Sequence, residues 1–152
     1  MAANQPERIP GLAALDVFVG EWVEEVALPG SSSGRVVFAW ALNGQYLLQR
    51  STFAASPVPD SLALIACGAE TDTYLQHYFD ARGVVRLYQM RLRGGVWTLR
   101  RADPDFSPLD FWQRFEGTFA ASGDRIEARW EQSHDSGATW QLDFRLTYTR
   151  VG

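Results

Sequence analysis

The sequence contains no lysine, so all 14 of its Lys-plus-Arg positive charges are arginines. They are outnumbered by 18 Asp and Glu residues, which gives a formal net charge of -4, and they form no basic run. Nucleic-acid binding depends on clustered cationic side chains that contact phosphates, so nucleic acid is not expected as a partner. The rigid, forked guanidinium of arginine instead suits recognition of a carboxylate or phosphate, or plain ion pairs.

Cysteine and long apolar runs are also scarce. The single cysteine, Cys67, cannot form a disulfide within the chain, which favours a reducing compartment. No run approaches the roughly 20 apolar residues of a membrane span. The N-terminal MAANQPERIPG lacks the apolar core of a signal peptide. We therefore expect a cytoplasmic protein with no membrane partner.

The strongest positive signal is an alternation of apolar and polar residues. The segment TWQLDFRLTY, residues 139–148, places its large apolar side chains at every second position. RIEARWEQ, residues 125–132, and QRFEGTF, residues 113–119, repeat the pattern. A period of two is that of a strand with one buried and one solvated face, and a helix would not maintain it.

Short turn signals separate these segments and define the fold class. Asn43-Gly44 and Gly94-Gly95 accept the positive φ that two-residue hairpins require. The segments between turns predict about ten strands, near residues 18–28, 34–42, 45–54, 61–68, 73–80, 84–93, 96–101, 111–120, 125–133 and 139–150. The long crossovers that parallel strands need are largely missing, so the strands are antiparallel. We predict one all-β domain over residues 1–152, an up-and-down barrel, with a two-sheet sandwich as the alternative.

Two segments are expected to close the ends of this barrel. Leu12, Leu15 and Phe18 are spaced three apart, which predicts a short N-terminal helical turn that plugs one end, after a flexible segment 1–10. The connection ADPDFSPLDF, residues 102–111, is long and partly apolar. It is expected either to cover the other end with Phe106 or to form a packed surface loop.

Two short motifs resemble the calycin superfamily. Gly20 and Trp22 in FVGEW resemble its first-strand Gly-x-Trp motif, and Arg150 in TYTRV resembles the last-strand arginine that packs across this tryptophan. Nearly the whole chain resembles an uncharacterised bacterial family of unknown function with a lipocalin-like barrel, distantly similar to fatty-acid-binding proteins and nitrobindin. The resemblance implies the barrel fold and no particular activity.

The sequence departs from each better-known relative. Only LPGSSSG, residues 28–34, stands where fatty-acid-binding proteins carry two helices, and the disulfides of secreted lipocalins are absent. Nitrobindin places a haem-ligating histidine on a late strand. The late histidine here, His134, falls in the turn SHDSGAT, a poor position for haem ligation.

The apolar faces of the predicted strands direct a set of aromatic and polar side chains inward. The predicted ligand-binding residues are Trp22, Trp40, Arg50, His77, Arg86, Tyr88, Met90, Gln113, Phe115, Trp130 and Phe144. Apolar walls with a few polar groups are typical of a small-molecule site. An unpaired inward arginine would suit a carboxylate, whereas pairing with Glu24 or Glu70 is the structural alternative.

These observations favour an intracellular barrel that binds a small hydrophobic or amphipathic molecule, either apolar or carboxylated. An isomerase, cyclase or hydrolase with His77 or Glu24 as general acid or base is one alternative, and haem binding through His77 is another. No motif indicates a metal site or another cofactor. Val85 and Leu87 are expected on the outer face, where they form a candidate interface for a homodimer.

Overall fold

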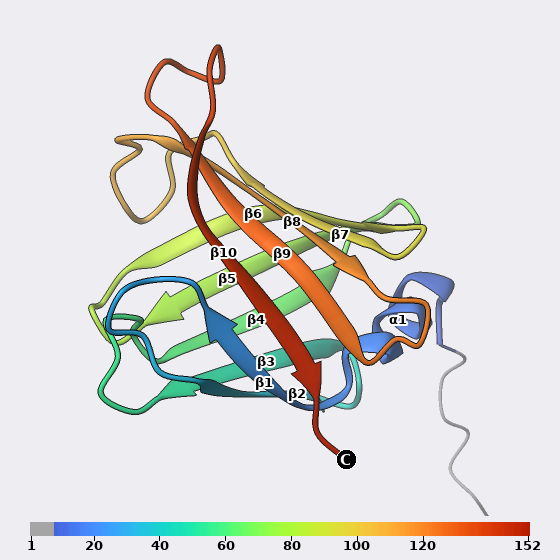
Figure 1. Cartoon of the computed structure of the whole chain (residues 1–152). Coiled ribbons are helices and arrows are strands. Elements are labelled where there is room, and N and C mark those ends of the chain that lie inside the picture. Colours follow the sequence, from blue (N-terminus) through green and yellow to red (C-terminus); the bar gives the residue numbers. More distant parts are fainter. Residues whose placement is uncertain (1–7) are drawn as a thin grey trace, which may run out of the picture.

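Residues 8–152 are described by a computed structural model, and they form a closed antiparallel barrel (Figure 1). The strands follow one another around the barrel in chain order, and β1 pairs with β10 to close it. This confirms the predicted up-and-down barrel, in which closure pairs both edges of every strand. The ten strands are β1 (Gly20–Val26), β2 (Gly34–Ala41), β3 (Tyr46–Phe53), β4 (Ser61–Cys67), β5 (Thr73–Asp80), β6 (Val85–Arg93), β7 (Val96–Arg101), β8 (Trp112–Phe119), β9 (Arg125–Ser133) and β10 (Gln141–Arg150).

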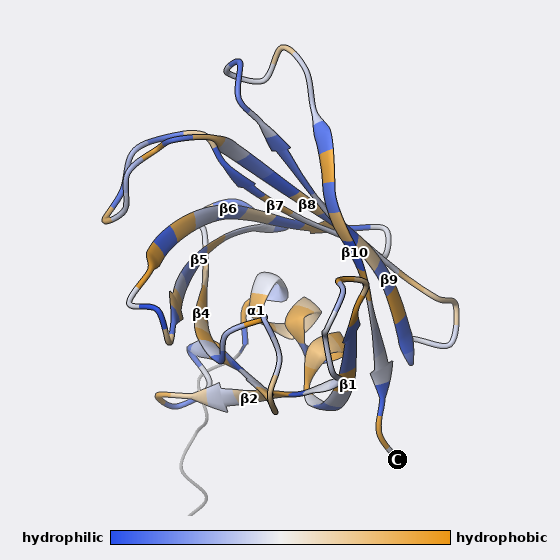
Figure 2. Ribbon diagram, turned by 60° about the vertical axis from the view of Figure 1, so that its left-hand side comes forward, coloured by the Kyte–Doolittle hydropathy of each residue, from blue (hydrophilic) through white to orange (hydrophobic). Residues whose placement is uncertain are grey.

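Two short helical turns, α1 (Pro10–Ala14) and η1 (Leu15–Phe18), close one end of the barrel (Figure 2). Their apolar side chains, Leu12, Leu15 and Phe18, are buried, as the spacing of three predicted. Residues 1–7 of the segment expected to be flexible lie outside the described residues. Within residues 8–152, no helix is long and apolar enough to cross a membrane.

The first and last strands are locked together at this closed end. The Arg150 guanidinium lies 4.2 Å from the centre of the Trp22 ring and donates hydrogen bonds to the carbonyls of Val17 and Val19. Trp22 in turn donates from Nε1 to the Phe18 carbonyl at 2.8 Å. The contact between Trp22 and Arg150 that the resemblance implied is therefore present, and it ties the helical plug to both strands.

The predicted register of β5 is wrong by one residue. Tyr74 and Gln76 are buried, whereas Leu75 and Phe79 are 39% and 40% exposed on the outer face. His77 shares the outer face with Leu75 and Phe79, because side chains alternate along a strand. A slip of one residue exchanges every side chain between the two faces, so His77 does not point into the barrel.

The register of β3 is wrong in the same way. Leu47 and Ser51 are buried on the inner face, and Tyr46 and Arg50 are exposed. Arg50 therefore faces solvent rather than the barrel interior. In both strands the apolar residues are divided between the two faces, so the choice of an inward face from hydrophobicity alone failed.

Strand β10 contains an irregularity that the alternation did not predict. Its register against β9 shifts between Leu142 and Phe144, and Leu142 is 51% exposed rather than buried. Beyond the shift, Leu146 and Tyr148 are buried as predicted. A bulge of this kind re-aims the side chains around it, and here it places Asp143 next to Phe144 at the wall of the interior cavity.

Candidate ligand-binding cavity

A cavity of about 320 Å³ occupies the barrel interior away from the helical plug. Its mouth is formed by loops at the open end, which contribute Leu28 between β1 and β2, Val58 between β3 and β4, and Phe111 between β7 and β8. Ligand pockets have volumes of roughly 300–1,000 Å³, so this one suits a compact molecule. Its deeper apolar wall consists of Val26, Ala63, Trp97, Leu99, Phe115, Trp130 and Phe144.

The cavity brings together part of the residue set that the sequence predicted. Those that line it are Arg86, Tyr88, Gln113, Phe115, Trp130 and Phe144. They come from strands β6, β8, β9 and β10, where the alternation of apolar and polar residues defined the inner face. The Phe115 and Trp130 rings pack 5.1 Å apart, and the Tyr88 and Trp130 rings 5.4 Å apart.

Five other predicted residues lie elsewhere. Trp22 and Met90 are fully buried in the core and do not line the cavity. Trp40 lies half-buried near the helical plug, where its Nε1 donates to Asp16 and Arg8 stacks on its ring at 4.6 Å. Arg50 and His77 face outward, for the reasons of register given above.

Several cavity-lining polar residues were absent from the predicted site. They include Glu24, Gln49, Ser51, Gln76, Tyr78 and Tyr148. Four of them belong to β3 and β5, whose register was misassigned. Tyr148 was on the predicted inner face of β10, and Glu24 is two residues from the inward Trp22, so the alternation contained the signal for both.

Two arginines line the cavity, Arg82, which is paired with Asp80, and Arg86 on β6. The Arg86 guanidinium lies 5.8 Å from the centre of the Phe111 ring at the mouth, and its Nε atom is buried without a hydrogen-bond partner. Among residues 8–152, Arg86 takes part in no ion pair, so neither Glu24 nor Glu70 is its partner. Arg86 as a whole is half-buried, but a buried N–H group without a partner is costly, and an anion that enters the cavity would relieve that cost.

Two acidic residues line the cavity, Glu24 and Asp143, and only Glu24 is buried. Glu24 lies on β1 directly opposite Tyr148 on β10. Burial raises the pKa of the Glu24 carboxyl to about 7, and the Tyr148 hydroxyl partly counters that rise. Near neutral pH this carboxyl is therefore divided between its charged and neutral forms, which distinguishes it from an ordinary surface glutamate.

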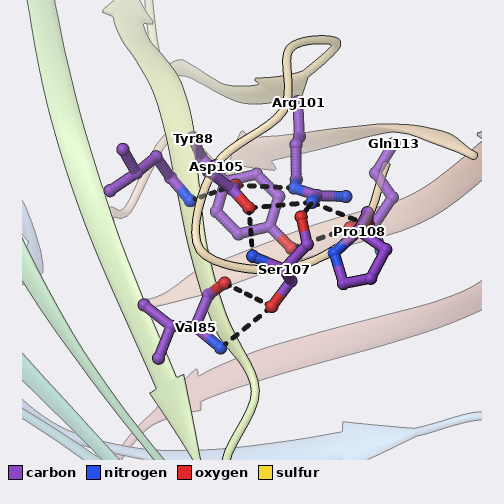
Figure 3. Close-up of polar contacts among 8 residues, drawn as sticks. Val85, Tyr88, Arg101, Asp105, Ser107, Pro108 and Gln113 are labelled. Carbon is purple, nitrogen blue, oxygen red and sulfur yellow. Dashed lines mark hydrogen bonds and ion pairs between the residues drawn. The ribbon is translucent and has the colours of Figure 1, made fainter. Parts of the chain in front are cut away.

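The loop 102–111 is fastened to the barrel by a buried ion pair (Figure 3). Arg101 on β7 donates from Nε and Nη2 to the two oxygens of Asp105, at 2.8 and 2.9 Å. Asp105 also accepts from the backbone nitrogens of Leu87 and Ser107, and Ser107 donates from its hydroxyl to the Val85 carbonyl. These contacts attach the loop to β6 and set the position of the segment that leads to the cavity mouth.

The residue of this loop that covers the cavity is not the predicted one. Phe106 is 77% exposed, so of the two alternatives for this loop, the one in which Phe106 covers the barrel end is wrong. Phe111, at the far end of the loop, lines the cavity and stacks against Arg86. The Arg101–Asp105 pair turns the loop so that position 106 faces solvent, and the chain returns to the barrel only before β8.

Comparison with known proteins supports the fold and leaves the ligand open. No family model and no curated protein matches the chain. The crystal structure of Rv2717c from M. tuberculosis superposes with a TM-score of 0.65, covering 96% of this chain and 100% of that one, at 15% sequence identity. The chain therefore shares its ten-stranded barrel architecture with the M. tuberculosis protein.

Proposed function

We propose that the protein binds a small apolar carboxylate in its interior cavity, as a lipocalin-like intracellular carrier. The observation that supports this most directly is Arg86, a cation inside an aromatic cavity whose Nε has no partner. A carboxylate would accept from the guanidinium in the forked geometry that arginine favours. The apolar body of the ligand would pack against Phe115, Trp130 and Phe144.

The calycin-like features of the chain are consistent with this proposal. The contact between Trp22 and Arg150 at the closed end leaves the open end free for ligand entry. The diameter of a barrel grows with its number of strands, and eight strands already suffice to hold one small ligand, so a barrel of ten strands has room for one. The fold alone would not assign this role, and the proposal depends on the cavity and Arg86.

Replacing Arg86 by methionine tests the proposal. We expect wild-type protein to bind 4-phenylbutyrate at least ten times more tightly than 4-phenylbutyramide, because only the acid can pair with a guanidinium. Arg86→Met should lower the affinity for the acid about 10- to 100-fold and leave that for the amide nearly unchanged. Isothermal titration calorimetry measures both affinities.

Arg91→Met is the matched control for this variant. Arg91 lies on the same strand, but its side chain is exposed on the outer face. It should leave both affinities at wild-type values. Equal binding of the acid and the amide to wild-type protein, or an unchanged affinity for the acid in Arg86→Met, would contradict the proposal.

A proton-transfer enzyme is the second candidate, and the buried Glu24 carboxyl favours it. A general base is most effective when its pKa lies near the working pH, and the pKa of Glu24 is raised to about 7. His77, the other acid–base candidate, faces away from the cavity. This reading therefore depends on Glu24 alone.

Deuterium exchange distinguishes the enzyme from the binding protein. If Glu24 is a general base, it removes a C3 proton from 4-phenyl-2-oxobutyrate, and the resulting enolate takes a deuteron back at the same carbon in D₂O. Proton NMR should then show faster loss of the C3 signal with wild-type protein than with Glu24→Gln. Exchange at the buffer rate with both proteins would reject this candidate and leave the binding protein.

A further inference from the structure

Two other cavity-lining side chains carry buried polar atoms that have no hydrogen-bond partner. Gln76 is 3% exposed and its Oε1 is unpartnered, and Trp97 is 1% exposed and its Nε1 is unpartnered. Buried polar atoms in native structures nearly always have a partner, because an unmade hydrogen bond there costs free energy. Two such atoms from different strands in one cavity point to a ligand that supplies their partners.

The two atoms offer opposite hydrogen-bonding roles. The amide oxygen of Gln76 only accepts a hydrogen bond, and the indole nitrogen of Trp97 only donates one. A hydroxyl group both donates and accepts, so a ligand hydroxyl offers each of these atoms the kind of partner that it lacks. A ligand methyl or aromatic C–H group in the same place would satisfy neither.

These side chains lie deeper in the barrel than Arg86. On β5 and β6 the pair Tyr78 and Arg86 lies nearest the open end, and Gln76 pairs with Tyr88 one inward position further in. Trp97 forms the floor, where its ring packs 4.9 Å from the Phe18 ring of the helical plug. The cation is therefore at the mouth, and the unpartnered acceptor and donor lie toward the closed end.

The floor holds a second pair of polar groups beside Trp97. The Tyr148 ring lies 5.9 Å from the Trp97 ring, and Tyr148 faces Glu24 across the β1–β10 ladder. Both residues line the cavity. The far end of the cavity is thus a polar patch beneath an aromatic wall, rather than the uniformly apolar end that an alkyl or phenyl tail would prefer.

We propose that the ligand is a hydroxylated apolar carboxylate, held with its carboxylate at Arg86 and its hydroxyl between Gln76 and Trp97. This inference rests on the carboxylate-binding function proposed above and adds the polar group at the opposite end. The cavity of about 320 Å³ restricts the ligand to a compact molecule, such as a single ring with a short acid chain.

A set of four compounds tests the two polar ends separately. The compounds are 4-phenylbutyrate, 4-(4-hydroxyphenyl)butyrate and the amide of each. We expect the hydroxyl to improve the affinity of the acid about 10- to 100-fold, since a site built to hydrogen-bond a hydroxyl leaves its own groups unpaired without one. Calorimetry is the readout, because it does not depend on the fluorescence of Trp97.

Two variants, each of which removes one proposed hydrogen-bond partner of the ligand hydroxyl, test where this hydroxyl binds. Gln76→Leu and Trp97→Phe should each reduce the preference for the hydroxylated acid to near one. The control variants Gln89→Leu, exposed on the outer face of β6, and Trp140→Phe, which does not line the cavity, should keep it. Arg86→Met should weaken both acids equally and also keep the preference.

The failure of this inference differs from the failure of the proposed function. If both acids bind through Arg86 with equal affinity, or if the preference survives in both Gln76→Leu and Trp97→Phe, the hydroxyl assignment is wrong and the carboxylate site stands. If neither acid binds better than its amide, the carboxylate function itself is wrong.

Discussion

Replacing Asp105 by alanine should lower the free energy of unfolding by about 3–5 kcal/mol, because it leaves the buried Arg101 guanidinium without its counter-charge. The side chains of Arg101 and Asp105 are 1% and 2% exposed, so water cannot solvate the Arg101 guanidinium when the carboxylate is removed. The Arg101 guanidinium and two backbone N–H groups hold the pKa of the Asp105 carboxyl well below its usual range. Urea unfolding at pH 7 followed by circular dichroism measures the change.

The matched control for this variant is Asp103→Ala. Asp103 lies two residues earlier in the same loop and is exposed, so its loss should change stability by less than about 0.5 kcal/mol. A double variant, Arg101→Met with Asp105→Leu, should recover much of the stability that Asp105→Ala loses. It removes the buried positive charge, whereas Asp105→Ala leaves that charge without a partner. A loss below about 1 kcal/mol in Asp105→Ala would show that the pair does not anchor the loop.

The strands whose sequence separates apolar from polar residues were predicted correctly. In β8 and β9, Phe115 and Ile126 alternate with charged residues, and the structure buries both on the inner face. One register then places every charge in water, so the sequence contains enough information to choose it. The inward positions of Phe115 and Trp130 in the cavity wall follow from this.

Strand β5 shows where the same reasoning fails. Its sequence TYLQHYFD has large apolar or aromatic residues on both faces, and the chosen face placed His77 inward. The interior of this barrel is a partly polar cavity, so the inner face carries Gln76 and Tyr78 while Leu75 and Phe79 face outward. A rule that assigns the more hydrophobic face to the interior is unreliable where the interior contains a partly polar cavity.

The loop contacts were beyond prediction for a different reason. Asp105 binds Arg101 at the end of β7 and also the backbone of Leu87 on β6, and Ser107 binds Val85. Such contacts join segments about 20 residues apart through single side chains and leave no periodic pattern. The exposed position of Phe106 is a consequence of these contacts.

Replacing Glu24 by glutamine should stabilise the protein at pH 8 and have little effect at pH 4.5. Burial raises the pKa of the Glu24 carboxyl from its usual value of 4.5 to about 7 in the folded state. The protonated carboxyl therefore contributes stability that is fully present below the unfolded-state pKa and is lost as the pH rises through about 7. Glutamine cannot ionise, so the variant should be roughly 2–3 kcal/mol more stable than wild type at pH 8.

The difference between variant and wild type isolates this group from the other carboxylates. Arg101 and Thr139 hold the pKa values of Asp105 and Asp135 low, and those groups lose their contribution only as the pH falls. Glu25→Gln, an exposed change one residue further along β1, should keep the wild-type pH dependence. Urea unfolding of all three proteins between pH 4.5 and 8 measures it. A stability difference between Glu24→Gln and wild type that does not change over this range would show that the Glu24 carboxyl ionises as freely in the folded protein as in water, and it could then serve neither as a buried general base nor as part of a polar cavity floor.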